Sequence, residues 1–105
     1  MSETVALCAP DELLSGQARR FDVSGHRIAL VRIDDTFYAI DDECSHEDYS
    51  LSEGEVWVAE CQIECPRHGS MFDLVTGDAC SLPATRPVGV YEVKVEDDIV
   101  VVVLP

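Results

Sequence analysis

Four residues in two short segments offer the clearest chemistry in this chain of 105 residues. The first segment reads Cys44-Ser45-His46, and the second reads Cys65-Pro66-Arg67-His68-Gly69. Each segment supplies one thiolate and one imidazole, so together they form a ligand set of two cysteines and two histidines. Such a set suits either a zinc ion or an iron-sulfur cluster.

The order of the ligand types helps to separate these two possibilities. Structural zinc sites usually place like ligands together, with two cysteines in one short motif and two histidines in another. Here each segment mixes one cysteine with one histidine, which a single metal ion does not require. A loop lying along the axis between two irons can place its thiolate on one iron and its imidazole on the other. The spacing therefore favours a two-iron cluster, with a zinc site and an accidental set as alternatives.

The composition excludes several classes of partner. The chain has 21 acidic and 7 basic residues, for a formal net charge of −14. Nucleic acids and anionic membrane surfaces require clustered Lys and Arg, so neither is expected as a partner. An acidic field of this strength steers a protein towards a basic patch on another protein, although it also serves solubility.

The N-terminal sequence has no basic region followed by an apolar stretch, and no segment approaches the roughly 18 apolar residues of a membrane span. We therefore expect a cytoplasmic protein. In a reducing compartment the other cysteines, Cys8, Cys61 and Cys80, are expected to be small buried apolar residues rather than disulfide partners. Cys61 lies close to Cys65 in sequence, but the histidine-bearing segments already complete a ligand set without it.

Short apolar segments separated by turn residues follow one another along the chain. Strands are expected at residues 4–9, 18–23, 26–33, 36–40, 56–63 (as one or two strands), 71–74, 88–95 and 99–104. Only residues 10–14 suggest a helical turn, and residues 50–54 read as a turn. This pattern predicts one all-β domain over residues 1–105, either an antiparallel sandwich or a small barrel.

Both ligand segments directly follow a predicted strand. Neighbouring loops at one end of a sheet would bring the four ligands together, with rigid strands holding the loop bases. No Ser-His-Asp arrangement, phosphate-binding glycine loop or pattern of two histidines and one carboxylate occurs in a recognisable context. The sequence thus gives no support for an enzyme that oxidises a substrate.

The two ligand segments, followed by Ser81-Leu82-Pro83-Ala84, strongly resemble the signature of the Rieske proteins. That signature is Cys-x-His, then Cys-x-x-His, then a downstream loop containing proline. The resemblance extends over essentially the whole chain and is closest to the small Rieske ferredoxins of bacterial ring-hydroxylating dioxygenases of the biphenyl and phenylpropionate type. It implies a Rieske-like antiparallel β-sandwich or pair of small barrels, with a cluster-binding loop subdomain at about residues 41–84 inserted in the β-base.

The resemblance also implies the cofactor, one Rieske-type 2Fe-2S cluster. Cys44 and Cys65 would bind its inner iron, and His46 and His68 its outer, more exposed iron. Neutral imidazoles in place of two thiolates remove negative charge, which raises the reduction potential above that of an all-cysteine ferredoxin.

Three further residues are expected around the cluster. Gly69 would let the backbone pass close to it, and Ser70 would raise its potential. Pro83 would lie over the cluster and keep water away.

Departures from the respiratory Rieske proteins indicate the subclass. Those proteins have one more cysteine in each ligand segment, and the two form a disulfide that braces the cluster. Tyr49 and Arg67 occupy the corresponding positions here, and Phe72 stands where those proteins have a tyrosine that donates a hydrogen bond to sulfur. We therefore expect a low-potential centre, towards the end near −150 mV of a roughly 450 mV range. Nearby acids are expected to act in the same direction: Asp41, Asp42, Glu43, Glu47 and Asp48.

Two aromatic residues outside the motif also have expected places. His26 is expected at the surface, and Trp57 is expected partly buried beside the cluster-binding subdomain.

The function that these features imply is that of a one-electron carrier. It would be a soluble monomer that accepts an electron from a flavin-dependent ferredoxin reductase and passes it to a terminal non-haem iron oxygenase. Two alternatives stay open, an accessory protein of iron-sulfur cluster assembly and a zinc-bound regulatory module without redox activity. The oxygenase substrate is not identified, because its contacts would lie on another polypeptide.

Overall fold

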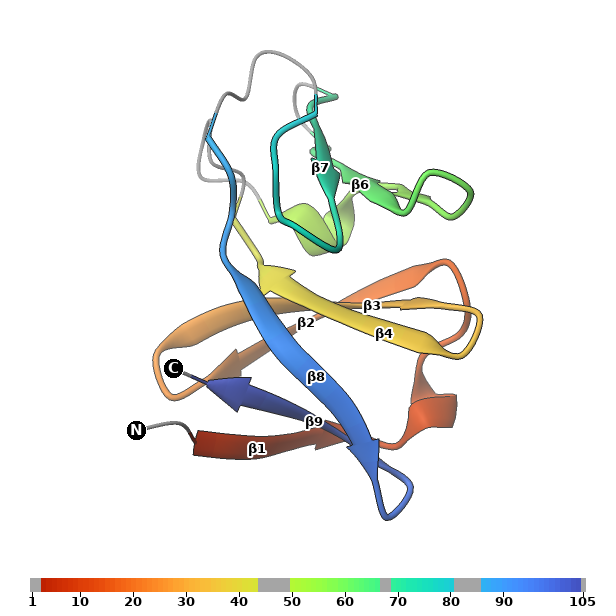
Figure 1. Cartoon of the computed structure of the whole chain (residues 1–105), viewed down its shortest axis with the longest axis vertical. Helices are drawn as coiled ribbons and strands as arrows, with labels where there is room; N and C mark the ends of the chain where they lie inside the picture. Colours follow the sequence, from red (N-terminus) through yellow and green to blue (C-terminus); the bar gives the residue numbers. More distant parts are fainter. Residues whose placement is uncertain (1–2, 44–49, 67–68, 81–85, 105) are drawn as a thin grey trace.

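Two antiparallel sheets make up the described part of the chain, residues 3–43, 50–66, 69–80 and 86–104 of a computed structural model. The larger sheet has six strands in the order β1-β9-β8-β4-β3-β2 and curls into a half-barrel (Figure 1). Its strands are β1 (Glu3–Cys8), β2 (Gln17–Val23), β3 (His26–Ile33), β4 (Thr36–Asp41), β8 (Val90–Glu96) and β9 (Ile99–Leu104). The smaller sheet contains β5 (Val56–Trp57), β6 (Gln62–Glu64) and β7 (Met71–Asp73) in chain order.

The helical content of the described residues is limited to two single turns of 3-10 helix. These are η1 (Pro10–Glu12) and η2 (Leu51–Glu53). The prediction of an all-β chain is therefore confirmed, and so is the helical turn within residues 10–14. Residues 50–54, predicted as a turn, contain η2, and the predicted segment 56–63 divides into β5 and the start of β6. No helix in these described ranges is long and apolar enough to cross a membrane.

Tight turns with left-handed backbone conformation join the two strands of each of two hairpins in the larger sheet. Ser24 and Gly25 have φ values of 48° and 81° between β2 and β3, and Asp97 and Asp98 have 50° and 61° between β8 and β9. Two positive φ values in succession are what two-residue hairpin turns require, because this geometry matches the twist of the flanking strands. Asp tolerates this conformation better than most residues, which explains the Asp-Asp pair at the β8–β9 turn.

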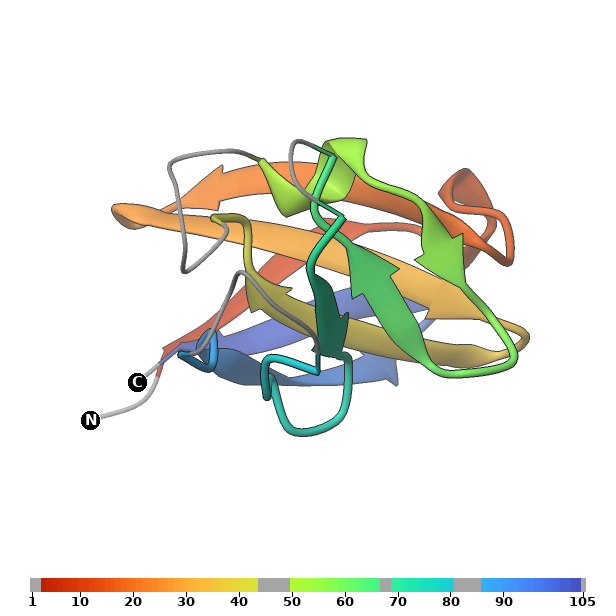
Figure 2. The same ribbon diagram turned by 90° about the horizontal axis from the view of Figure 1, so that it is seen from above.

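Strand β3 lies between two hydrophobic cores. Its alternate residues Ala29, Val31 and Ile33 face a core shared with the smaller sheet, while Ile28 and Leu30 face the inside of the curled larger sheet. All five are at most 9% exposed. Burial on both faces explains why β3 reads as a nearly continuous apolar run. Figure 2 shows the smaller sheet lying over β3 and β4, so the cores stack on either side of these strands.

Gly54 allows the smaller sheet to pack tightly. It follows η2, and a Cβ atom at this position would lie only 1.6 Å from the carbonyl oxygen of Glu64. The amide of Glu64 donates a hydrogen bond of 2.8 Å to the carbonyl of Glu55, which keeps the two backbones in contact. Only glycine fits here, and the segment that follows the first ligand motif is thereby held against the strand that leads into Cys65.

We expect Gly54→Ala to destabilise the protein by about 2 kcal/mol or more, because its methyl group must displace backbone atoms. In a thermal melt this corresponds to a fall in Tm of roughly 10 °C for a domain of this size. Gly25→Ala is the matched control, since it has a positive φ of 81° but meets no atom within 4 Å. The control should cost about 1 kcal/mol. A Gly54→Ala variant that melts within about 2 °C of the unaltered protein would contradict the packing constraint.

Candidate metal centre

Cys65 is the predicted ligand that the structure describes. It directly follows β6, is fully buried and forms no disulfide. Its neighbours in the core include Ile63 and Phe72, which face each other across β6 and β7. The other three predicted ligands, Cys44, His46 and His68, lie outside the described residues, as do Pro83, Tyr49 and Arg67. Their positions in the site stay predictions.

Two backbone hydrogen bonds close the turn that begins at Cys65. The amide of Cys65 donates to the carbonyl of Ser70 at 2.7 Å, and the amide of Gly69 donates to the carbonyl of Cys65 at 3.0 Å. Gly69 has a φ of 74°, a conformation that favours glycine, and Ser70 is fully buried. Among the described atoms, a Cβ at Gly69 would meet only Glu64 Oε2, at 3.9 Å. The described contacts thus require glycine here for its backbone conformation.

A buried carboxylate, that of Asp42, connects the residues before and after the first ligand segment. Asp42 is fully buried, and its Oδ1 accepts a hydrogen bond of 2.6 Å from the amide of Ser52. The hydroxyls of Ser50 and Ser52 both donate to Asp42 Oδ2. Residues on either side of the segment are therefore tied to one side chain. This role was not predicted, although the sequence has an acid before the segment and two serines shortly after it.

The surroundings of Asp42 also neutralise part of its charge. The Arg20 Nε atom lies 3.7 Å from Asp42 Oδ2, and the three hydrogen bonds to the carboxylate provide further positive dipoles. A buried charge is stable only with such partners. From the sequence, Asp42 is expected to lower the reduction potential through its negative charge. That effect stays a prediction, while the partners of the carboxylate were not predicted.

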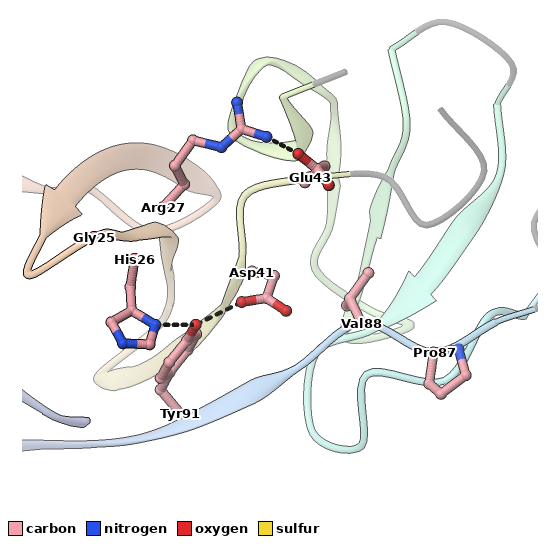
Figure 3. A pocket seen from close by; sticks show the side chains of 8 residues that line it. All are labelled: Gly25, His26, Arg27, Asp41, Glu43, Pro87, Val88 and Tyr91. Atoms are coloured by element: carbon pink, nitrogen blue, oxygen red, sulfur yellow. Dashed lines mark hydrogen bonds and ion pairs between the residues drawn. The ribbon is translucent and has the colours of Figure 1, made fainter. Parts of the chain in front are cut away.

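Its two neighbours, Asp41 and Glu43, also have partners. Asp41 accepts hydrogen bonds from the Tyr91 hydroxyl at 2.6 Å and from the Gly89 amide at 2.9 Å, and Glu43 forms an ion pair with Arg27 (Figure 3). The field of these carboxylates is consequently weaker than their formal charges suggest. Glu47 and Asp48, the other two acids of the predicted group, lie outside the described residues.

The cysteines outside the predicted ligand set are less buried than expected. Cys8 and Cys61 are half-buried, and Cys80 is exposed, so the expectation of three buried apolar residues was wrong. Burial and the charge of Glu12 raise the pKa of the Cys8 thiol, which keeps it protonated near neutral pH. All described cysteines are free, in agreement with the expected absence of disulfides among them.

Trp57 borders the second ligand segment on the outside. Its side chain is 41% exposed, more than expected, and its Nε1 donates a hydrogen bond of 3.1 Å to Glu64 Oε1. Glu64 directly precedes Cys65, so the indole is hydrogen-bonded to the residue next to the predicted ligand.

The described residues fit an iron-sulfur cluster. Cys65 offers a buried thiol without a disulfide partner, at a turn that two hydrogen bonds fix. A cluster that must be shielded from water needs a ligand in such a place. The described residues on either side of the first ligand segment meet at a second fixed point, the Asp42 carboxylate. The bases of both ligand loops, at Cys65 and at Asp42, are therefore fixed. Such an arrangement suits a donor set of two thiolates and two imidazoles.

Comparisons with known proteins give the same answer. Residues 3–92 match the Rieske [2Fe-2S] domain. The chain is 42% identical over 98 residues to the 3-phenylpropionate/cinnamic acid dioxygenase ferredoxin subunit of Shigella flexneri, covering 93% of this chain and 91% of that protein. It is 41% identical over 92 residues to ferredoxin CarAc of Metapseudomonas resinovorans, covering 87% of this chain and 84% of that protein.

A solved structure shares the whole fold. The ferredoxin of carbazole 1,9a-dioxygenase from Nocardioides aromaticivorans superimposes with a TM-score of 0.92 at 36% identity, over 94% of this chain and 95% of that one. The domain match and the relatives agree over nearly the full length, and the predicted Rieske-like fold is confirmed. The chain therefore belongs to the Rieske [2Fe-2S] domain family, and its cofactor is a Rieske-type 2Fe-2S cluster.

Proposed function

We propose that this chain is a low-potential Rieske ferredoxin that takes one electron from a flavin-dependent reductase and delivers it to a terminal non-haem iron oxygenase. The observation that carries the proposal is the buried, disulfide-free Cys65 at a fixed turn of a Rieske domain. Relatives of the chain are named as ferredoxin subunits of dioxygenases, which are electron-transfer components and not catalytic ones. The role of electron carrier is that of the family, and neither the assembly accessory nor the zinc module is favoured.

The ligand set in this proposal is Cys44, His46, Cys65 and His68, within a subdomain at about residues 41–84. When bound, the cluster supplies a one-electron acceptor that gains one negative charge on reduction. The protein's contribution is to bury the thiolate side, to hold each ligand loop at its base and to exclude water, with Gly69, Ser70 and Pro83 beside the cluster. These tasks match the buried turn at Cys65 and the closed loop base at Asp42.

The proposal includes two redox partners, an oxygenase as electron acceptor and a reductase as electron donor. A similar structure, 40% identical with a TM-score of 0.88 over 94% of this chain and 91% of that one, is a complex of reduced oxygenase and oxidised ferredoxin in carbazole 1,9a-dioxygenase. By analogy, an oxygenase would bind this chain as electron acceptor, and a flavin-dependent reductase would be its donor. Cytoplasmic location and a monomeric state suit a carrier that visits two partners in turn.

The assigned ligands predict which variants lose the cluster signal. Replacing either histidine, as in His46→Ala or His68→Ala, should abolish or drastically alter the EPR signal of the reduced protein, because an imidazole is lost from an iron. Cys61→Ser is the matched control, since Cys61 is half-buried and lies four residues before Cys65. The control should keep the signal. An unchanged signal in a histidine variant, or its loss in Cys61→Ser, would refute the ligand assignment.

Phe72 offers a test of the low potential. It is fully buried and packs in the same core as Cys65, where the resemblance places a tyrosine in high-potential relatives. In Phe72→Tyr the new hydroxyl can donate to sulfur, which stabilises the added negative charge. A net hydrogen bond of about 1 to 1.5 kcal/mol corresponds to a rise in midpoint potential of roughly 40 to 60 mV for one electron.

Voltammetry measures this shift directly. Phe37→Tyr is the control, because Phe37 is also nearly buried but lies in the other core, so its midpoint should not move. A Phe72→Tyr midpoint equal to that of the unaltered protein would argue against a sulfur acceptor near position 72. A midpoint of the unaltered protein above roughly +100 mV would overturn the low-potential assignment.

The charge of −14 predicts how electron delivery depends on salt. An acidic carrier and a basic docking surface attract each other over about one Debye length, so salt should slow their association. Reduction of an oxygenase by this protein, followed by stopped-flow absorbance, should therefore slow as salt rises from low concentration. A rate independent of salt would indicate that the charge serves only solubility.

A further inference from the structure

A chain of three polar side chains connects β3, β8 and β4 (Figure 3). The Tyr91 hydroxyl donates to Asp41 Oδ1 at 2.6 Å, and the His26 Nδ1 atom lies 3.3 Å from the same hydroxyl oxygen. A tyrosine hydroxyl has one proton, and the carboxylate takes it, so His26 Nδ1 is the protonated nitrogen and donates to Tyr91. His26 was expected at the surface, but it is partly buried.

The other oxygen of Asp41 is equally engaged. Asp41 Oδ2 accepts from the Gly89 amide at 2.9 Å, and the Asp41 amide donates to the Gly89 carbonyl at 2.9 Å. A Cβ at Gly89 would lie 2.6 Å from Asp41 Oδ2, so any larger residue here would displace the carboxylate. We call this set of contacts, made by Asp41, Gly89, Tyr91 and His26, the Asp41 clamp.

The clamp lies between two segments that matter for the cluster. Asp41 is the last residue of β4 and precedes Cys44 by three residues. Gly89 and Tyr91 begin the return of the chain after residues 81–85, the segment that contains Pro83. One carboxylate therefore fixes the entry to the first ligand segment relative to the exit from the proposed covering segment.

Pairing between β4 and β8 does not depend on the Tyr91 hydroxyl. The register between these strands joins Ala39 to Tyr91 and Ile40 to Val90 through the backbone. The hydroxyl adds a contact to Asp41 beyond that pairing, at the edge of a polar cavity of about 340 Å³. Burial, followed by the bond to Asp41, raises the pKa of Tyr91, so the hydroxyl keeps its proton and its donor role across the physiological pH range.

We propose that Tyr91 is a positioning residue for the cluster, acting through Asp41 to fix the residue at the entry to the first ligand segment relative to the start of β8. The proposal rests on the ligand set proposed above. Tyr91 is not itself a ligand. Removal of its hydroxyl should leave the fold intact while loosening the base of the first ligand segment.

The test compares Tyr91→Phe with the unaltered holoprotein. The variant keeps the ring, which packs edge-on against His26 with centroids 5.8 Å apart, and loses only the hydroxyl. In the presence of an iron chelator we expect its visible cluster absorption to disappear about fivefold faster, the effect of one net hydrogen bond. The EPR signal of the reduced variant should also shift from that of the unaltered protein, since the geometry of the first ligand segment changes.

Two further variants make the outcome decisive. Ser15→Ala removes one hydroxyl hydrogen bond, of 2.8 Å to the Asp34 amide, at the turn between β3 and β4, and it should change neither the loss rate nor the EPR signal. Gly89→Ala attacks the other half of the clamp and should reproduce the faster loss, again with a shifted signal.

A Tyr91→Phe protein with an unaltered loss rate and an unaltered EPR signal would overturn the proposal. Equal acceleration by Ser15→Ala would overturn it as well, because the effect would then be general. If the unaltered chain shows no Rieske-type EPR signal at all, the ligand set fails instead, so the two failures are distinguishable.

Discussion

The arrangement of the site depends on the hydrogen bonds of two carboxylates at the end of β4, Asp41 and Asp42. Asp42 points into the interior and ties down the chain on the far side of the first ligand segment through Ser50 and Ser52. Asp41 binds the start of β8 through Gly89 and Tyr91. A pair of adjacent acids thus fixes two loops that begin or end at the rigid larger sheet. Asp42 is buried and Asp41 is partly buried. Carboxylates removed from water in this way need hydrogen-bond partners, and each of their four oxygens has a described one.

The smaller sheet performs the corresponding task for the second ligand segment. It packs over β3 and β4 through a shared core that includes Leu51, Ile63 and Phe72, and Cys65 belongs to that core. The thiol is therefore placed by hydrophobic packing, while the first ligand segment is placed by buried polar contacts. Gly54 lets the two meet, because a larger residue would separate the segment after the first motif from the strand before the second.

Most of the fold was predictable from local patterns, since strand alternation and turn residues act over a few positions. The hairpin turns at Ser24-Gly25 and Asp97-Asp98 are examples, and the strands around them were expected within about two residues. The division into two sheets was not predictable in the same way. The dual burial of β3 depends on a second sheet packing on it, which its own sequence shows only as an apolar run.

The features of the candidate site also differ in whether local sequence patterns could predict them. Ligand types and spacing favoured a two-iron cluster over zinc, because each segment mixes a thiolate with an imidazole, and the family resemblance then indicated the Rieske type. The partners of Asp41 and Asp42 were not predicted, and the two acids were expected only to disfavour reduction of the cluster through their charge. Tyr91 lies 50 residues from Asp41, so only the β4–β8 pairing brings them together. Net charge along a chain therefore overstates the field at a site whose acids have internal partners.

The central claim is that one cluster in this protein has two histidine ligands. Pulsed EPR of the reduced, unaltered protein tests it most directly, since it detects magnetic coupling of the cluster's electron spin to nearby nitrogen nuclei. The account predicts strong coupling to two imidazole nitrogens on one iron. A reduced cluster without coupling to histidine nitrogen, or a colourless protein that contains only zinc, would contradict it.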